Sequence, residues 1–340
     1  MPFPYKDEIT GAELVAEYAA IIKGKTILTT GVSPNSLGAH YVETIAAGQP
    51  KLLVLAGRDL TKVEETAESI SKAHPNVQTR VLQLDLGSFA AVRRAAAEVN
   101  SWDDVPAIDV LMNNAGIMAV PYKICEDGYE SQLTCNHLGH FLLTNLILDK
   151  ILASTDKRVV NVSSGGHWFS AIRYADINYD MTDLRGGMVV IELQGGETYE
   201  KWNAYGQSKT ANVLFSIGLA NKFGDRGVLA YSLNPGAIAT TNLAGHLDFA
   251  PGGDLDSLAR ISRLTASPFG WMDKEILSLD RGVATHIFAS FDPVLKDHNG
   301  KYLLEKARVA DYYVDPVHPH AISNIEADKL WELSVKAVGL

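Results

Sequence analysis

The stretch Lys25-Thr26-Ile27-Leu28-Thr29-Thr30-Gly31 is an apolar, strand-like segment that runs into a turn. Val32-Ser33-Pro34-Asn35-Ser36-Leu37-Gly38 follows it and leads to a helical pattern from Ala39 to Ala47. A strand, a glycine loop and a helix in this order bring a diphosphate against backbone amides at a helix N-terminus, because glycine allows close approach. An adenine dinucleotide fits that use, although an ordinary strand-to-helix connection would look the same in isolation.

Strand-like and helical segments alternate along the rest of the chain, which requires a parallel sheet covered by helices on both faces. The expected strands are 25–30, 51–57, 78–85, 108–113, 158–163, 228–234 and 300–304. Helices are expected near 36–47, 61–73, 88–99, 130–152, 203–222 and 280–290. Thr10 and Glu13 fit a capping box, which predicts a short helix before the first strand. We therefore predict a single α/β domain over residues 1–340, with a doubly wound parallel sheet of about seven strands.

Composition and charge narrow the class of protein. A chain of 340 residues with 46% hydrophobic content can bury a large core, and its net charge of −10 argues against a nucleic-acid or anionic-membrane partner. No stretch of about 18 uncharged apolar residues exists, and residues 1–8 lack a basic region followed by an apolar core, so the cytoplasm is the expected compartment. The spacing of Cys125 and Cys135 fits neither a metal site nor a redox pair, so we expect two ordinary thiols and no metal.

The stretch Tyr205-Gly206-Gln207-Ser208-Lys209 follows Ser164 and the expected strand 158–163. Residues four apart on a helix point from one face, so the phenol and the ammonium would be neighbours. A free tyrosine has a pKa of about 10, and a fixed neighbouring cation favours its phenolate. A serine hydroxyl at a strand end could hold a carbonyl or alcohol oxygen beside the phenol, so the three residues predict a proton-transfer site. A Tyr-x-x-x-Lys pair also occurs by chance on exposed helices, and the other motifs decide between the two readings.

Four blocks, in order, make the chain resemble the short-chain dehydrogenase/reductase family from residue 25 to the C-terminus. They are Thr30-Gly31 through Gly38, Asn113-Asn114-Ala115-Gly116, the set Ser164, Tyr205 and Lys209, and Pro235-Gly236. The family's catalytic asparagine, in the pattern Asn-x-x-Gly-x-Phe, maps to Asn136. The Gly-x-Ser-Lys-x-Ala-Asn sequence after Tyr205 is similar to the branch of retinol dehydrogenases, WW-domain oxidoreductases and many fungal secondary-metabolism reductases. The resemblance implies a Rossmann-like fold in which Asn136, Ser164, Tyr205 and Lys209 are catalytic.

The resemblance also implies the residues that would bind a nicotinamide cofactor. The glycine loop is one residue longer than the family's usual form, and Asn35 or Ser36 replaces its middle glycine. Asparagine tolerates left-handed backbone geometry, so the turn is expected to survive. Asp85 matches the family's adenine contact, with a helix cap as the alternative, and Asn114 is expected to steady the central sheet. The full expected set is Gly31, Ser33, Asn35, Ser36, Leu37, Gly38, Arg58, Asp85, Leu86, Asn114, Ala115, Gly116, Tyr205, Lys209, Pro235, Gly236, Ile238 and Thr240.

The end of the second expected strand predicts the type of cofactor. Binding of an unphosphorylated ribose normally uses an acidic residue about 20 residues after the glycine loop. Here the strand ends Leu55-Ala56-Gly57-Arg58, with no carboxylate before Asp59. A guanidinium at this point can bind the 2′-phosphate, so NADP(H) is predicted over NAD(H), with a solvated arginine as the alternative.

The substrate side is expected to come from an insertion and a loop. From Ser164 to Tyr205 the chain runs 41 positions, where many short family members need about a dozen, so residues 165–202 are predicted to form an insertion beside the active site. With a loop region at 237–275, this insertion and its stretch Met188-Val189-Val190-Ile191 would enclose a medium-sized apolar substrate. The alternative is that the insertion caps the sheet or covers an oligomer surface. Residues 1–24 are expected to form an N-terminal extension. The expected contacts are His167, Trp168, Tyr199 and Trp202, and a structural or solvated role is the alternative for His167.

Together these residues predict an NADP-dependent alcohol dehydrogenase or carbonyl reductase that acts on a small-molecule carbonyl or alcohol. Tyr205 would exchange the proton, Ser164 would position the oxygen, and Lys209 would lower the pKa of the phenol and grip the nicotinamide ribose. His137 and His140 are expected to serve helix packing. The alternative is a cofactor-binding regulatory or scaffold protein, which the loss of a catalytic residue would favour, and none of the four is lost. The sequence leaves the substrate, the reaction direction and a homo-oligomer open.

Overall fold

The computed structural model describes Tyr5 and residues 8–180, 198–267 and 275–340. Within these ranges the chain forms one eight-stranded sheet in the order β3-β2-β1-β4-β5-β6-β7-β8. The strands are β1 (Thr26–Thr30), β2 (Leu52–Gly57), β3 (Gln78–Gln83), β4 (Val110–Asn113), β5 (Lys157–Val162), β6 (Val228–Leu233), β7 (Tyr302–Leu304) and β8 (Arg308–Val309). The first seven pair in parallel, which confirms the predicted doubly wound α/β fold.

The eighth strand is a difference from the prediction. β8 pairs antiparallel with β7, with Leu303 opposite Val309 and Leu304 opposite Arg308. Two residues are too few to show an alternating pattern in the sequence. The other strands lie where expected, and the shifts are small: β3 ends at Gln83, two residues before the predicted end.

The inner parallel strands are buried on both faces, which explains their nearly continuous apolar sequences, whereas the edge strand β3 is largely exposed or half-buried. Every residue of β1, β2 and β4 is buried. Successive side chains of a strand point to opposite faces, so Leu28 and Leu111 belong to one core cluster whereas Ile27 and Val110 belong to another. The sheet therefore separates two apolar cores.

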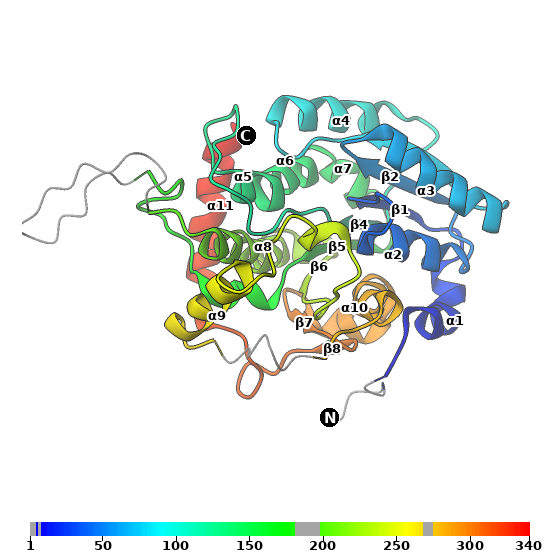
Figure 1. The fold of residues 1–340 in the computed structure, drawn as a ribbon. Helices are drawn as coiled ribbons and strands as arrows, with labels where there is room; N and C mark the ends of the chain where they lie inside the picture. Colours follow the sequence, from blue (N-terminus) through cyan, green and yellow to red (C-terminus); the bar gives the residue numbers. More distant parts are fainter. Residues whose placement is uncertain (1–4, 6–7, 181–197, 268–274) are drawn as a thin grey trace, which may run out of the picture.

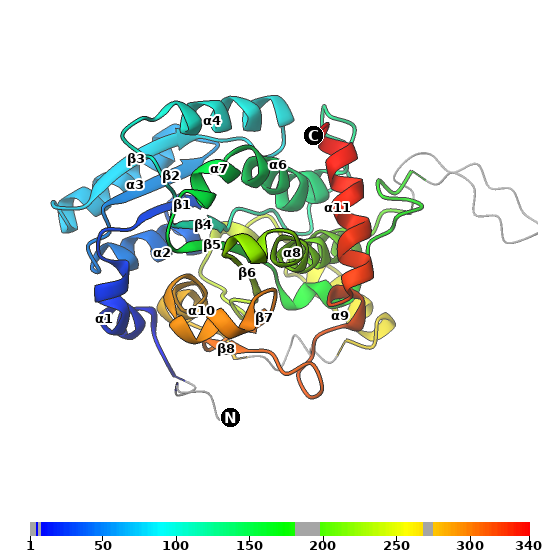
Figure 2. The ribbon, with the colours of Figure 1, turned by 180° about the vertical axis from the view of Figure 1, so that it is seen from behind.

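Helices cover both faces of the sheet (Figures 1 and 2). The first core cluster includes side chains of α4 (Phe89–Ser101), α6 (Gly139–Leu146), α8 (Lys201–Phe223) and α11 (Asn324–Val338). The second includes side chains of α1 (Gly11–Ile22), α2 (Leu37–Ala46), α3 (Leu60–Ala73) and α10 (Leu279–Phe291). The capping box of α1 is confirmed: the Thr10 hydroxyl accepts the Glu13 N–H at 3.3 Å, and the Glu13 carboxylate accepts the Thr10 N–H at 2.9 Å.

The predicted helix over 130–152 is divided into four pieces. α5 (Ser131–Leu133) leads into a π-helical turn, η1 (Thr134–Leu138), and then into α6 and α7 (Leu148–Leu152). A Cβ on Gly139, the first residue of α6, would lie 2.5 Å from the Leu86 carbonyl oxygen, so this helix approaches the segment after β3 closely. Hydrophobic periodicity does not separate α-helical from π-helical bonding over five residues, so the sequence does not predict the turn.

Among the described residues, two α-helices are absent from the prediction. α9 (Asp254–Leu264) lies within the expected loop region, and α11 follows the last strand. α11 buries Ala327, Leu330, Ser334 and Val338, whose spacing of three and four residues is a helical signal that the sequence does contain. In the described parts of the chain, none of the helices has the length and apolarity that crossing a membrane requires.

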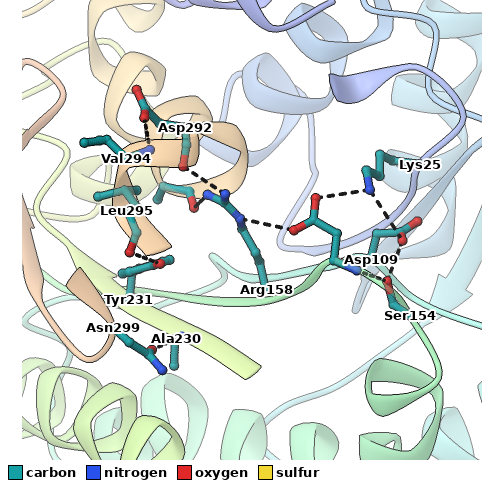
Figure 3. A network of polar contacts seen from close by, with 12 residues as sticks. Lys25, Asp109, Ser154, Arg158, Ala230, Tyr231, Asp292, Val294, Leu295 and Asn299 are labelled. Atoms are coloured by element: carbon teal, nitrogen blue, oxygen red, sulfur yellow. Dashed lines mark hydrogen bonds and ion pairs between the residues drawn. The ribbon is translucent and has the colours of Figure 1, made fainter. Parts of the chain in front are cut away.

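Charged residues gather at the edge of the sheet where strands begin (Figure 3). Lys25 and Asp109 immediately precede β1 and β4, and Arg158 is the second residue of β5. The Lys25 ammonium lies 3.9 Å from Asp109 and 3.1 Å from Asp156. The Arg158 side chain is 2% exposed, lies 3.7 Å from Asp156, and donates to two backbone carbonyls at the end of α10 at 3.1 and 2.8 Å. We call Lys25, Asp109, Asp156 and Arg158 the amino-edge network.

Candidate active site

The glycine loop brings β1 and α2 against the segment after β4. Gly31 has φ +75°, and a Cβ there would lie 2.7 Å from the Ala115 Cα atom. A Cβ on Gly38 would lie 2.4 Å from the Gly31 carbonyl oxygen, so both positions require glycine. Asn35 has φ 60°, the left-handed geometry expected of the residue that replaces the middle glycine. The Ser36 hydroxyl caps α2 by accepting a backbone N–H of its first turn at 3.0 Å.

Two asparagines fasten the strand ends on which the site is built. The Asn114 side chain donates to the carbonyl oxygens of Thr30 (2.9 Å) and Gly31 (3.2 Å), which joins β4 to β1 and agrees with its expected steadying role. Asn234 joins β6 to β5, because its Oδ1 accepts one backbone N–H after each strand, both at 3.3 Å. Sequence reasoning missed Asn234, although it directly precedes the Pro-Gly motif.

The four residues expected to carry the chemistry lie together at the carboxyl edge of the sheet. Ser164 follows β5, Tyr205 and Lys209 lie one turn apart on α8, and Asn136 lies in η1. The Ser164 hydroxyl lies beside the Tyr205 ring, because a Cβ on Gly166 would lie 2.8 Å from that ring and 3.4 Å from Ser164 Oγ. The Lys209 ammonium lies 5.6 Å from the centre of the Tyr205 ring. A Cβ on Gly116 would lie 3.2 Å from Asn136 Oδ1 and 3.3 Å from Lys209 Nζ. The fold thus brings together a tetrad drawn from three distant stretches of sequence.

Burial governs the protonation of Tyr205 and Lys209. Burial raises the pKa of Tyr205 to about 12, although the neighbouring Ser164 hydroxyl lowers it. Burial lowers the pKa of Lys209 to about 7. The sequence predicts that Lys209 lowers the pKa of the phenol, whereas the structure gives a net rise, because desolvation disfavours the charged form of each group. At neutral pH Tyr205 is protonated and Lys209 is close to the midpoint of its titration.

Both polar atoms of the Asn136 side chain form hydrogen bonds within the protein. Its Oδ1 accepts the Ile117 N–H at 2.8 Å, and its Nδ2 donates to the Ile117 carbonyl at 2.9 Å and to the Ser208 hydroxyl at 2.8 Å. These bonds fasten η1 to the segment after β4 and to α8. Asn136 therefore holds the π-helical turn against the helix that carries Tyr205 and Lys209.

His140 connects the tetrad to the glycine loop, beyond the packing role that the sequence suggests. Its Nδ1 lies 3.1 Å from the Asn136 carbonyl oxygen, which can only accept, so Nδ1 carries the proton. Nε2 then accepts from the Thr30 hydroxyl at 2.8 Å, and that hydroxyl oxygen accepts the N–H groups of Asn114 and Ala115, each at 3.0 Å. Burial lowers the pKa of His140 to about 4, so the ring is neutral. The sequence signal is the spacing of four residues, which places His140 one turn after Asn136.

The other expected cofactor residues lie along the same edge of the sheet. Arg58 follows β2, is exposed, and takes part in none of the ion pairs formed among the described residues. Asp85 Oδ1 accepts the Gly87 N–H at 2.9 Å, whereas Ser88 caps α4, so the helix-cap alternative for Asp85 is wrong. Leu86 is buried.

The segment after β6 returns to the glycine loop. The Asn242 N–H donates to the Asn35 carbonyl at 3.4 Å. A Cβ on Gly282 of α10 would lie 3.0 Å from Ile238 and 3.2 Å from Leu37, so two expected cofactor residues meet at this glycine. The remaining ones are partly buried or exposed: Ser33, Pro235, Gly236 and Thr240.

The two regions expected on the substrate side meet in an apolar cluster, which we call the side cluster. Its buried members are Ala119, Phe169, Trp202, Leu258 and Ile261. Trp202 Nε1 donates to the hydroxyl of Ser257 at 2.9 Å, and Lys201 forms an ion pair with Asp254. These contacts fasten the described ends of the insertion to α9. Met188-Val189-Val190-Ile191 and residues 268–274 lie outside the described residues.

Trp168 and Tyr199 lie on the two flanks of the insertion. Trp168 Nε1 donates to the Thr265 carbonyl at 3.1 Å, just beyond α9. The Tyr199 hydroxyl donates to the Val120 carbonyl at 2.9 Å and accepts from the Gln132 side chain at 2.8 Å. Both side chains therefore tie the insertion to neighbouring segments, and direct contact with a substrate stays a prediction.

His167 has the structural role that the sequence analysis left as the alternative. Its side chain is 0% exposed. Nδ1 donates to the Ser164 carbonyl at 2.7 Å, and Nε2 accepts the His318 N–H at 3.3 Å. A ring that is buried and bonded through both nitrogens supports the Ser164 backbone, and direct contact of His167 with a substrate stays a prediction.

Comparisons with known proteins show which family the chain is similar to. A family model described as short chain dehydrogenase matches residues 25–175. Retinol dehydrogenase 13 from Homo sapiens is 32% identical over 338 residues, which cover 98% of this chain and 90% of that protein. Short-chain dehydrogenase/reductase prx1 from Penicillium roqueforti is 34% identical over 329 residues, which cover 94% of this chain and 86% of that protein. A crystal structure of a protein from Mycobacterium Paratuberculosis has a TM-score of 0.59 and 29% identity, covering 94% of this chain and 97% of that one.

The fold and the site therefore define an oxidoreductase of the dinucleotide-binding α/β class. The chain belongs to the short-chain dehydrogenase/reductase family. Its similarity to a retinol dehydrogenase and to a fungal dehydrogenase/reductase confirms the predicted branch.

Proposed function

We propose that this protein is an NADP-dependent oxidoreductase that transfers hydride between the nicotinamide and a carbonyl or secondary alcohol of a medium-sized apolar substrate. The observation that carries the proposal is the convergence of Ser164, Tyr205, Lys209 and Asn136 beside the glycine loop. Because all four are present and adjacent, catalysis is favoured over a regulatory or scaffold role.

The residues at the carboxyl edge fit a phosphorylated dinucleotide. Gly31 and Gly38 leave no room for a Cβ, which suits a loop whose backbone approaches a diphosphate at the N-terminus of α2. The exposed guanidinium of Arg58 is suited to a 2′-phosphate and supports NADP(H) over NAD(H). We assign the adenine to Asp85 and Leu86, the nicotinamide ribose to Lys209 and residues 114–116, and the carboxamide side to residues 235–240. Bound NADP(H) supplies or accepts the hydride.

Tyr205 acts as the acid in the reduction direction and as the base in oxidation. Its phenol carries a proton at neutral pH because burial raises its pKa to about 12. Ser164 lies beside the Tyr205 ring, so the two hydroxyls can hold one substrate oxygen. Protonated Lys209, beside the ring, favours the phenolate as the proton leaves, and its pKa of about 7 makes this support dependent on pH. Asn136 keeps η1 against α8 and so keeps Lys209 in place.

The side cluster supports an apolar substrate. Phe169 and Trp202 lie between Ser164 and Tyr205 in sequence, and their packing against α9 sets apolar side chains beside α8, the helix that begins with Lys201. The net charge of −10 supports a small molecule over a nucleic acid as the partner. The cytoplasm is the compartment that we propose, and the oligomeric state is left open.

A substrate screen tests the proposal. Purified protein is assayed with NADPH and with NADH against medium-sized apolar ketones, with polar ketones of the same carbon number as controls. We expect ketone-dependent oxidation of NADPH, faster for the apolar members and slower with NADH. Tight binding of NADPH without turnover of any ketone, or of any alcohol in the reverse direction, would favour the scaffold alternative.

A further inference from the structure

The two cysteines of the chain, ten positions apart, are brought into contact by the fold. The side chains of Cys125 and Cys135 are near enough that each shifts the pKa of the other thiol. A Cβ on Gly87 would lie 3.4 Å from the Cys135 sulfur and 4.0 Å from the Cys125 sulfur, so both sulfurs line the same side of this glycine. Both residues are partly exposed. Their sequence spacing gives no sign of this contact, and both cysteines are free thiols, as expected.

The backbone holds the two cysteines at the ends of one compact loop. Cys125 begins a turn in which its carbonyl accepts the Gly128 N–H at 2.9 Å and its N–H donates to the Tyr129 carbonyl at 2.8 Å. Cys135 lies in η1, directly after α5, whose first N–H groups are bonded by the Glu130 carboxylate at 2.8 Å. The thiols therefore face each other from two ordered segments, and a bond between them would close a short loop.

The two thiols differ in acidity. The neighbouring Cys135 thiol lowers the pKa of Cys125, and the nearby charge of Lys123 acts in the same direction. The neighbouring Cys125 thiol and burial raise the pKa of Cys135. Since the thiolate is the nucleophile in thiol chemistry, Cys125 is the thiol that reacts first, and Cys135 is placed to react second.

We propose that Cys125 and Cys135 form a redox-reactive dithiol that a small-molecule disulfide such as glutathione disulfide converts to an intramolecular disulfide. The Cys125 thiolate attacks one sulfur of glutathione disulfide, and the first glutathione leaves as a thiolate. Cys135 gives its proton to the solvent and attacks the Cys125 sulfur, which releases the second glutathione. The two protein thiols lose two protons and two electrons in total. Glutathione disulfide takes up these two electrons and two protons and becomes two molecules of glutathione.

The pair borders the segment to which the proposed function assigns the adenine, and this part of the inference rests on that function. The Asp85 carboxylate lies 3.2 Å from the same Cβ position on Gly87 and accepts the Gly87 N–H at 2.9 Å. A disulfide holds its sulfurs about 2.05 Å apart, closer than two thiols that are not covalently bonded. Closing the bond must therefore move sulfur atoms that pack beside the turn from Asp85 to Gly87. We expect the oxidised protein to bind NADPH more weakly than the reduced protein.

The test begins with the full-length native protein in glutathione disulfide, followed by denaturation, alkylation with iodoacetamide and mass analysis. We expect wild type to lose both alkylatable thiols and to retain no glutathione. Mass analysis should show a peptide species in which a disulfide joins Cys125 and Cys135, and a reductant should restore both thiols. Cys135→Ser should stop at one bound glutathione on Cys125, and Cys125→Ser should leave Cys135 alkylatable. A wild-type protein that keeps both thiols, or that ends with glutathione attached, overturns the proposal.

A second readout separates the dithiol from the proposed function. NADPH is titrated into the reduced and the oxidised wild-type protein, with Cys125→Ser taken through the same treatment as the control. A larger dissociation constant for the oxidised wild type alone is the expected result, and equal constants overturn the link to the Asp85 segment. Failure of the reduced protein to bind NADPH would instead contradict the proposed function, whereas the mass analysis does not depend on cofactor binding.

Discussion

The two edges of the sheet are both lined with polar side chains, but they use them differently. At the amino edge, Arg158 is buried, faces Asp156 at 3.7 Å and donates to two backbone carbonyls (Figure 3). At the carboxyl edge, Arg58 is exposed and has no ion-pair partner among the described residues. Burial there raises the pKa of Tyr205 and lowers the pKa of Lys209, which favours the neutral form of each side chain. The first arrangement pairs its charges within the protein, although Arg158 Nε itself makes no hydrogen bond. The second leaves bonding capacity for a ligand.

The difference separates stability from function. Polar groups that bond one another inside a protein raise the free energy of unfolding and so stabilise the fold. Polar groups buried at a functional site commonly lower the free energy of unfolding. Arg158 and Arg58 are two arginines at opposite edges of the same sheet, and they offer a matched test of this distinction.

The largest expected effect on stability is that of Arg158→Met. The variant leaves two backbone carbonyls at the end of α10 without their donor, so we expect the free energy of unfolding to fall by about 2–4 kcal/mol. Asp156 keeps its ion pair with Lys25 at 3.1 Å, which limits the loss. Urea denaturation measures the change, and the folded variant should bind NADPH like wild type. If the variant kept the stability of wild type but bound NADPH more weakly, the stabilising role assigned to the amino edge would be wrong.

Arg58→Ala should show the opposite pattern. The affinity for NADPH should fall by about 1.5–3 kcal/mol, or about 10- to 100-fold, because a charge-assisted contact with the 2′-phosphate is removed. The affinity for NADH and the free energy of unfolding should stay unchanged, since Arg58 is exposed. Titration of both cofactors measures the effect, with Arg58→Lys as a control that keeps the charge. If wild type binds NADPH and NADH equally, the predicted cofactor preference is wrong.

Lys209→Met should change stability less than Arg158→Met does, and with the opposite sign. We expect it to raise the free energy of unfolding of the cofactor-free protein by about 1–2 kcal/mol at neutral pH, because a buried ammonium is removed. The Val162 carbonyl, to which Lys209 donates at 3.0 Å, keeps a second bond from Asn212 at 2.9 Å. Urea denaturation of the variant and wild type measures the difference.

The pH dependence of that difference follows from the pKa of Lys209. In the native protein it is about 7, and in the unfolded chain it is about 10.4. Between these values the unfolded chain binds the proton and the native protein does not, so the stability of wild type rises with pH. The advantage of Lys209→Met should therefore be largest below about pH 7 and should shrink as the pH rises toward about 10. An advantage that stays constant with pH would show that Lys209 is not the buried cation described here.

The sequence predicts most of the sheet and the identity of the tetrad, for physical reasons. Buried parallel strands such as β2 read as continuous apolar runs, and the left-handed φ of Asn35 follows from its residue type. The net rise in the pKa of Tyr205 is not predictable in this way, because it depends on how much of the chain packs over the phenol. The contact between Cys125 and Cys135 is likewise set by tertiary structure. The division of the 130–152 helix falls between these cases, since periodicity predicts a helix but not its π-helical turn.

The measurement that tests the account most directly compares Tyr205→Phe with wild type on the best substrate of the screen, with turnover, the NADPH dissociation constant and the free energy of unfolding measured together. Only a hydroxyl is removed, and the Ser164 hydroxyl keeps its bond from the Gly166 N–H at 3.0 Å. The account predicts a turnover about 10²- to 10⁴-fold lower, with NADPH binding and stability unchanged. Turnover near that of wild type would contradict the assignment of the carboxyl edge as the catalytic site.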